Sequence, residues 1–195
     1  MNTLKAIDTE YSGHKFRSRL EARWAIFFDI LNIKWQYEPE GYELDGIRYL
    51  PDFYLPEFNG GMYVEVKPVK LTEYEHEKAK RLCIATGKAV LLAVGVPDFA
   101  LYDYYEPYSE CIADGHQEYS ESWLEDVRPQ HTCIYGPKDK AELIYGLIKT
   151  DVGYRDNRMF AVPGYEAADA MYEDEYLDAV KAAKQARFEF NHKSI

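Results

Sequence analysis

The first clear pattern along the chain is an apolar stripe within FRSRLEARWAIFFDIL, residues 16–31. The large apolar side chains recur every three or four residues, at Leu20, Trp24, Phe27 and Leu31. This spacing places them on one face of a helix. It predicts an amphipathic helix over 16–31, with Ser12 and Gly13 at its entry.

The next forty residues read as strands separated by turns. Residues 33–40 and 41–55 are rich in aromatic and β-branched side chains, and Asp45-Gly46 is a two-residue hairpin signal. A second turn, FNGG at 58–61, precedes a strand at 62–69 that Pro68 is expected to end.

A second helix and a buried strand complete this half. Thr72 and Glu75 have the spacing of a capping box before the helix, and Gly87 fits the position just after it. The run AVLLAVGV at 89–96 is almost wholly apolar, as in a strand covered on both faces. The predicted order is α-β-β-β-α-β, a compact α/β core within residues 1–100.

The second half is less regular in pattern. Residues 101–135 are acidic and tyrosine-rich, and we predict an irregular insertion there. Residues 137–149, with Pro137 as a candidate first-turn residue, are predicted as a helix, and so are residues 172–190. Residues 136–195 would then form a C-terminal helical extension that packs on the core.

Charge is unevenly distributed along the chain. The net charge is −11, yet residues 1–100 carry 13 Lys and Arg against 15 Asp and Glu, a net of −2. The remainder, 101–195, carries 10 against 19, a net of −9. A nucleic-acid partner is therefore compatible with the first half, because the local field matters more than the sum. The acidic second half favours a protein partner with a basic surface.

Other features bear on the compartment. The sequence holds no apolar run of membrane-spanning length, and its first residues lack the apolar segment of a secretory signal. Three cysteines, an odd number, argue against a disulfide framework. We expect a cytoplasmic protein without a membrane partner.

Three ionisable residues interrupt the predicted strands in PDFYLPEFNGGMYVEVK. Glu65 and Lys67 share one face of their strand, and a hairpin would bring Asp52 beside Glu65. Two adjacent, partly buried carboxylates repel each other, and a divalent cation such as Mg²⁺ or Mn²⁺ removes that cost. Lys67 could then orient water or stabilise charge on a phosphate.

The first helix supplies a further carboxylate. Glu21 lies about 20° from Phe28 around the helix and borders the apolar stripe. It would point toward the sheet, or alternatively reach solvent or pair with Arg17.

These residues together resemble a known superfamily. Glu21, Pro51-Asp52 and Glu65-Val66-Lys67 match the pattern of PD-(D/E)xK nucleases, and the stretch around them is similar to small phage-encoded members. The resemblance implies a restriction-endonuclease-like αβββαβ core with a mixed central sheet. It also implies roles for each matching residue: Asp52, Glu65 and the Val66 carbonyl as metal ligands, Lys67 as the catalytic lysine, Glu21 as an auxiliary carboxylate, and Lys78 as a phosphate-facing residue.

The function that follows is Mg²⁺- or Mn²⁺-dependent hydrolysis of nucleic-acid phosphodiesters by a phage-type DNA endonuclease, with RNA as another possible substrate. A phage-encoded enzyme would act in the host cytoplasm. One alternative is a catalytically silent protein of this fold that binds nucleic acid or a host protein. Another is a homodimeric junction resolvase.

Two further groups of residues are candidates for binding. A basic run could contact backbone phosphates or form a solvated helix face: His14, Lys15, Arg17, Arg19 and Arg23. Four residues could supply a structural Zn²⁺ site: Cys111, His116, His131 and Cys133. Their spacing is not that of a standard zinc knuckle, so we interpret them as solvated histidines and incidental cysteines, with zinc as the alternative.

Overall fold

The structure is a computed structural model that describes residues 7–98, 100, 102–106, 130–135, 142–145, 152–155, 158–161 and 174–188. Its helices are α1 (Arg19–Ile30), α2 (Glu73–Thr86) and α6 (Asp174–Gln185). The strands up to the end of α2 are β1 (Thr9–Tyr11), β2 (His14–Phe16), β3 (Gln36–Tyr37), β4 (Tyr42–Leu44), β5 (Ile47–Tyr49), β6 (Phe53–Leu55) and β7 (Met62–Lys67). The later strands are β8 (Ala89–Val94), β9 (Tyr102–Tyr105), β10 (Gln130–Tyr135), β11 (Glu142–Tyr145), β12 (Val152–Arg155) and β13 (Arg158–Ala161).

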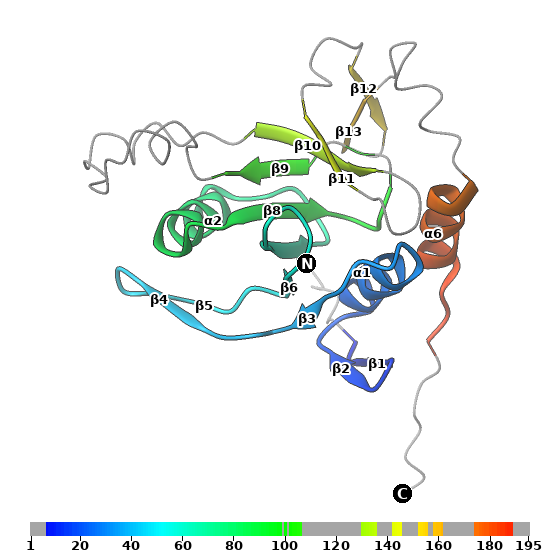
Figure 1. The fold of residues 1–195 in the computed structure, drawn as a ribbon, viewed down its shortest axis with the longest axis horizontal. Coiled ribbons are helices and arrows are strands. Elements are labelled where there is room, and N and C mark those ends of the chain that lie inside the picture. The colour runs from blue at the N-terminus through cyan, green and yellow to red at the C-terminus, as the bar shows by residue number, and fades with distance from the viewer. Residues whose placement is uncertain are drawn as a thin grey trace, which may run out of the picture.

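A central sheet organises these elements (Figure 1). Its seven strands lie in the order β11-β10-β9-β8-β7-β6-β3. Only β7 and β8 run parallel among these neighbours, and α2 forms the crossover that a parallel pair requires. The described chain is therefore an α/β protein with a mixed sheet, and this part of the predicted fold class is confirmed.

Alternation along the strands gives the sheet two apolar faces. Val64 and Val66 of β7 belong to a core that also contains side chains of α1 and α6. Tyr63, on the opposite face of β7, packs in a second core with α2 and the β4–β5 hairpin. Helix α6 lies beside α1 (Figure 1). Both faces of the strands that carry the candidate site are thus covered.

The element order of the first hundred residues follows the prediction closely. Helix α1 precedes β3, β6 and β7, and α2 then leads to β8, with the β4–β5 hairpin inserted between β3 and β6. Asp45 and Gly46 form the predicted hairpin turn, both with left-handed backbone angles. Thr72 and Glu75 form the predicted capping box of α2, and Gly87 ends that helix in the left-handed conformation.

The start of α1 differs from the prediction. Ser12 and Gly13 form the turn of a β1–β2 hairpin, with φ of 49° and 78°, and do not enter the helix. Ser18 is the N-cap, because its side chain accepts a hydrogen bond from the Glu21 amide. His14 and Lys15 consequently lie on β2, so the basic run is not one helix face.

The second half also differs from the prediction. Tyr102–Tyr105 and Gln130–Tyr135 form β9 and β10, so the ends of the expected irregular insertion extend the sheet. The helix predicted over 137–149 is wrong at Glu142–Tyr145, which forms β11. Leu143, Ile144 and Tyr145 suit a strand, and pairing with β10 outweighs the helical pattern. Residues 107–129 lie outside the described residues.

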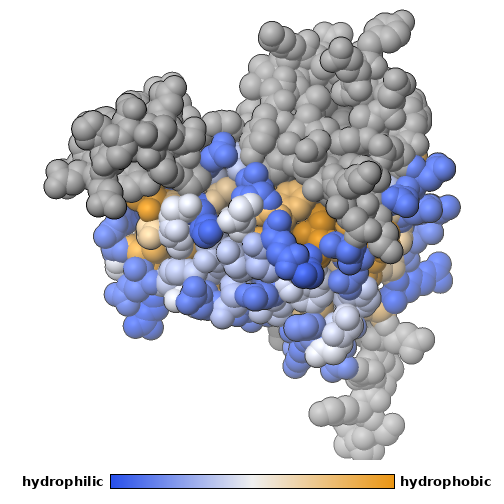
Figure 2. Space-filling view, viewed as in Figure 1, coloured by the Kyte–Doolittle hydropathy of each residue, from blue (hydrophilic) through white to orange (hydrophobic). Residues whose placement is uncertain are grey.

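A final helix is confirmed, but it ends at Gln185, and residues 186–188 are irregular where the helix was predicted to continue to residue 190. Helix α6 buries Tyr176, Ala179, Val180 and Ala183 in the core that it shares with α1. On the face shown in Figure 2 most of the described surface is hydrophilic, and hydrophobic side chains show mainly along its upper border. No helix among the described residues is long and apolar enough to cross a membrane.

Candidate active site

The hairpin of β6 and β7 brings two carboxylates together. Phe53 pairs with Val64 in the antiparallel register, so continuing the register by one residue sets Asp52 opposite Glu65. Both residues are buried, each with 4% of its surface exposed. Buried acids of this kind require partners or a cation, because desolvation disfavours their charged forms.

Both oxygens of Asp52 are engaged. The Val66 amide donates to Oδ2 at 2.7 Å, and the Arg17 guanidinium donates from Nη2 to Oδ1 at 2.8 Å. Burial, followed by repulsion from Glu65, nevertheless raises the pKa of Asp52 to about 8. The charged form of Asp52 is therefore disfavoured even though both of its oxygens accept hydrogen bonds.

The two oxygens of Glu65 differ in their partners. Lys67 Nζ lies 2.6 Å from Oε1, and Lys78 Nζ lies 3.8 Å from the same atom. Oε2 is buried and makes no hydrogen bond of standard geometry with the described residues, although the Tyr49 hydroxyl interacts with the Glu65 carboxylate and its pKa is raised partly by that contact. A buried carboxylate oxygen whose donor is poorly placed is costly, and a cation would relieve that cost.

The charge of Lys67 is secured by its neighbours. Burial, the largest single influence, lowers its pKa, but the charge and hydrogen bond of Glu65 together with the charges of Asp52 and Glu75 outweigh burial and raise the pKa above the ordinary value. Glu75, which also caps α2, lies 3.8 Å from Lys67 Nζ. Lys67 therefore stays an ammonium at neutral pH, on the same strand face as Glu65.

Glu21 is held at the start of α1. Its Oε1 accepts from Ser18 Oγ at 2.7 Å, and its Oε2 accepts from Tyr37 Oη at 2.6 Å and from the Arg17 amide at 3.1 Å. Glu21 is buried, and its charge contributes to the raised pKa of Asp52. Glu21 thus lies near the Asp52–Glu65 pair. The side chains of Ser18 and Tyr37 donate to Glu21, whereas the side chain of Arg17 donates to Asp52.

Lys78 is brought into the site by α2. Its ammonium lies 4.6 Å from the centre of the Tyr49 ring and 5.5 Å from that of Tyr74, besides its contact with Glu65. Tyr49 was not anticipated from the sequence. Burial, then the charge of Glu65, and then a hydrogen-bond interaction with Glu65 raise the pKa of Tyr49, although the geometry of that contact is not that of a standard hydrogen bond. The only signal for Tyr49 in the sequence is its position three residues before Asp52.

The rest of the basic run is not gathered at the site. Lys15 pairs with Asp8 at 3.3 Å on the exposed β1–β2 hairpin. Arg23 donates to the Ala186 carbonyl at 3.4 Å, which ties α1 to the segment after α6. Arg19, like Arg23, lies on α1. Of the contacts described above for this run, only that of Arg17 reaches the Asp52–Glu65 pair, through Asp52.

The described residues offer a metal ion only a small number of side-chain ligands at this place. No group of three or more His, Cys, Asp or Glu side chains within the described ranges is arranged to hold a metal ion. A divalent ion would therefore depend on Asp52, Glu65, main-chain oxygen and water, a combination that Mg²⁺ accepts. The repulsion within the pair and the absence of a standard hydrogen bond to Glu65 Oε2 from the described residues are compatible with such an ion.

The zinc alternative is not tested by the structure. Cys111 and His116 lie outside the described residues. His131 and Cys133 both lie on β10. Cys83, on α2, is a free buried cysteine in the second core.

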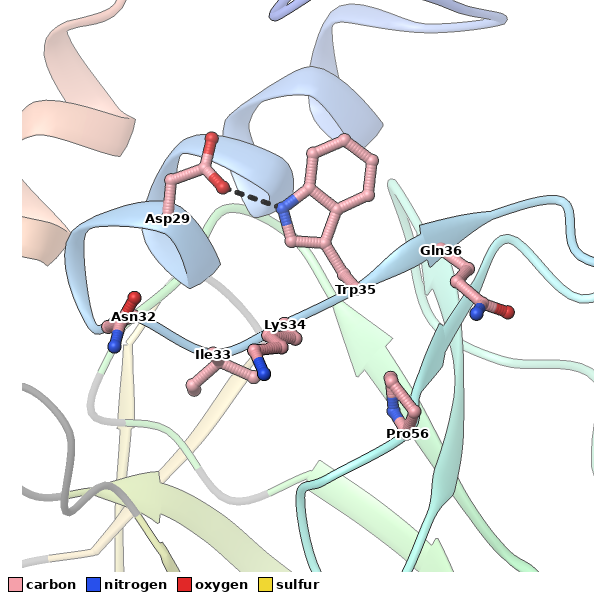
Figure 3. Close-up of a pocket in the computed structure, with 7 residues that line it drawn as sticks. All are labelled: Asp29, Asn32, Ile33, Lys34, Trp35, Gln36 and Pro56. Carbon is pink, nitrogen blue, oxygen red and sulfur yellow. Dashed lines mark hydrogen bonds between the residues drawn. The ribbon is translucent and has the colours of Figure 1, made fainter.

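A separate surface hollow lies between the end of α1 and the strand that follows it (Figure 3). Asp29 accepts a hydrogen bond from Trp35 Nε1 at 2.8 Å and another from Tyr11 Oη at 2.9 Å. Its carboxylate thus fastens the β1–β2 hairpin and the chain after α1 to the end of that helix. Asp52, Glu65 and Lys67 are not among the residues that line this hollow.

Comparisons with protein-family models, with curated proteins and with solved structures find no match to this chain. A functional assignment therefore rests on the site and on the sequence pattern.

Proposed function

We propose that this protein is a divalent-metal-dependent nuclease that hydrolyses nucleic-acid phosphodiester bonds, with a restriction-endonuclease-like core of the PD-(D/E)xK kind. The observation that carries the proposal is the buried pair of Asp52 and Glu65, set opposite each other, with no hydrogen bond of standard geometry to Glu65 Oε2 from the described residues. The order of α1, β3, β6, β7, α2 and β8 supports the proposed core. The phage-type DNA endonuclease inferred from the sequence pattern is the specific form that we propose.

The residues divide into ligands and supporting groups. Asp52 and Glu65, with the Val66 carbonyl, would hold Mg²⁺ or Mn²⁺. When bound, such an ion lowers the pKa of water and neutralises charge on a phosphate oxygen. The Val66 amide fixes the orientation of Asp52 through its 2.7 Å hydrogen bond to Oδ2.

Lys67 and Glu21 act beside the ligands. The charged ammonium of Lys67 would orient the attacking water and stabilise negative charge on the phosphate in the transition state. Lys78, 3.8 Å from Glu65, would add positive charge on the side of α2. Glu21, fixed by Ser18 and Tyr37, would accept a hydrogen bond from site water.

Cleavage assays test this proposal directly. Plasmid, single-stranded and four-way-junction DNA, together with RNA, are incubated with the protein in Mg²⁺, Mn²⁺ or EDTA. We expect cation-dependent cleavage that falls by about 10²- to 10³-fold in Lys67→Ala, because a group that stabilises transition-state charge is lost. Glu65→Gln should lose activity at least as completely.

A surface ion pair supplies matched controls. Lys34 and Glu57 lie 2.6 Å apart and are each 65% exposed. Lys34→Ala and Glu57→Gln make the same chemical changes far from the proposed chemistry and should cleave as the wild type does. Unchanged cation-dependent cleavage in Lys67→Ala would show that the assigned roles are wrong. Preference for the four-way junction by a dimer would favour the resolvase form.

One observation favours a second candidate function, a binding protein of this fold that does not cut. Arg17 and Lys67 already contact Asp52 and Glu65 at 2.8 and 2.6 Å, so protein cations partly neutralise the pair. In that case the protein would bind nucleic acid or a protein partner equally well in EDTA and in Mg²⁺. Absence of cleavage of all the substrates, together with cation-independent binding, would establish this function instead.

A further inference from the structure

Arg17 links the proposed metal ligand to a neighbouring carboxylate. Its Nη2 lies 2.8 Å from Asp52 Oδ1, and its Nε lies 2.6 Å from Glu38 Oε1. The Arg17 side chain is 56% exposed, whereas that of Asp52 is only 5% exposed. An accessible guanidinium therefore covers an otherwise buried acid.

Asp52 offers a cation the oxygen that Arg17 already contacts. Oδ2 accepts the Val66 amide within the sheet, so Oδ1 is the oxygen that is free of main-chain contacts. A divalent ion on Oδ1 and a guanidinium 2.8 Å from the same atom would repel each other strongly. The buried carboxylate cannot move away, because the Val66 amide holds it, whereas the exposed arginine can.

We propose that a divalent cation and Arg17 compete for Asp52, and that cation binding releases the guanidinium to contact a phosphate of the nucleic acid. This inference rests on the proposed nuclease function. Glu38 retains Arg17 near the site after release through the second ion pair. The planar fork of arginine suits two oxygens of a phosphate as well as it suits carboxylates.

The consequence is that metal and nucleic acid bind cooperatively. With Asp52 bound to Arg17, the site lacks its ligand oxygen and its phosphate contact at the same time. With Asp52 on the cation, both become available. Coupling of this kind is reciprocal, so each ligand should strengthen binding of the other.

Mg²⁺ binding, measured by titration calorimetry, tests the competition without relying on activity. Arg17→Met should bind Mg²⁺ about three- to tenfold more tightly than the wild type, the range expected for loss of one partly exposed competing ion pair. Arg17→Lys, which keeps the charge but not the fork, should fall between the two. Lys15→Met removes an exposed charge two residues away and should change the affinity by less than about twofold.

A second arginine provides an internal control for a spectroscopic test. Arg81 also contacts two carboxylates, with Nε 2.7 Å from Glu77 and Nη1 3.3 Å from Asp45. In ¹H–¹⁵N spectra, Mg²⁺ should shift the Nε–Hε signal of Arg17 and leave that of Arg81 in place. Arg17→Met should also weaken binding of a short DNA duplex in Ca²⁺ but leave it unchanged in EDTA.

The possible failures are separable. If neither the wild type nor Arg17→Met binds Mg²⁺, the proposed metal site fails and this inference fails with it. If Mg²⁺ binds but Arg17→Met shows equal or weaker affinity and the Arg17 signal does not move, the competition is refuted while the nuclease proposal stands. Tighter Mg²⁺ binding with unchanged DNA binding in Ca²⁺ would refute the release toward phosphate.

Discussion

Replacing Asp52 by asparagine should make the cation-free protein more stable at alkaline pH. The substitution removes a buried charge that faces Glu65 and leaves an oxygen to accept the Val66 amide. Arg17 keeps its second partner, Glu38. The free energy of unfolding therefore changes mainly because repulsion from Glu65 and the desolvation of a charge are relieved. Loss of the Arg17 contact has a smaller effect on it, because the Arg17 side chain is exposed.

The sign and size follow from the raised pKa of Asp52. Its pKa is about 8 in the folded protein against an ordinary value of 3.8, so the folded state holds this proton more tightly than the unfolded state does. Stability from this group is present below the unfolded value and is lost as the pH rises through the folded value. Each unit corresponds to about 1.4 kcal/mol, so the full window amounts to several kcal/mol.

Urea unfolding in EDTA at pH values from about 5 to 9 measures this difference. The advantage of Asp52→Asn over the wild type should be largest at about pH 9 and should shrink by about 1.4 kcal/mol per pH unit between about pH 8 and pH 5. Asp8→Asn, an exposed carboxylate on the β1–β2 hairpin, should follow the wild type at every pH. Parallel curves for Asp52→Asn and the wild type would refute the reasoning.

Added Mg²⁺ at about pH 8 should narrow the difference between Asp52→Asn and the wild type. A cation that binds only the folded wild type stabilises it by about 2.7 kcal/mol at a hundred times its dissociation constant, and Asp52→Asn should gain much less.

Three other substitutions test the fold around the site. Ser18→Ala should lower the free energy of unfolding by about 1 kcal/mol through loss of the α1 N-cap, measured by urea unfolding. Gly61→Ala should lower the melting temperature clearly more than Gly46→Ala. Both backbones are left-handed, but only at Gly61 would the new Cβ meet the Tyr54 hydroxyl. Equal losses in melting temperature would contradict this. Trp24→Phe should cost about 1 kcal/mol, since the Gly95 carbonyl loses its 2.9 Å bond from Nε1, and unchanged thermal unfolding would oppose that assignment.

Local patterns predicted the first hundred residues well because local chemistry determines them. The Asp45-Gly46 turn, the Thr72 cap and the apolar run of β8 each depend on a few neighbouring side chains. The placement of Asp52 beside Glu65 followed from strand alternation once a hairpin was assumed. These features need no information from distant parts of the chain.

The remaining features depend on contacts that are distant in sequence. Glu142–Tyr145 resembled part of a helix until β10 supplied a partner for it. Tyr49 reaches Lys78 only because the β4–β5 hairpin packs on α2. The contact of Arg17 with Asp52 joins residues 35 apart, and a pattern of apolar spacing contains no information about such a pair.

The register of the β6–β7 hairpin limits how the chain can evolve. A one-residue slip in the pairing of β6 with β7 would place Asp52 on the opposite side of the pleat from Glu65. A two-residue slip would restore the side but separate the two carboxylates by about 7 Å along the strand. Insertions and deletions within β6 or β7 should therefore be selected against, whereas the loop between the two strands can take up a change in length.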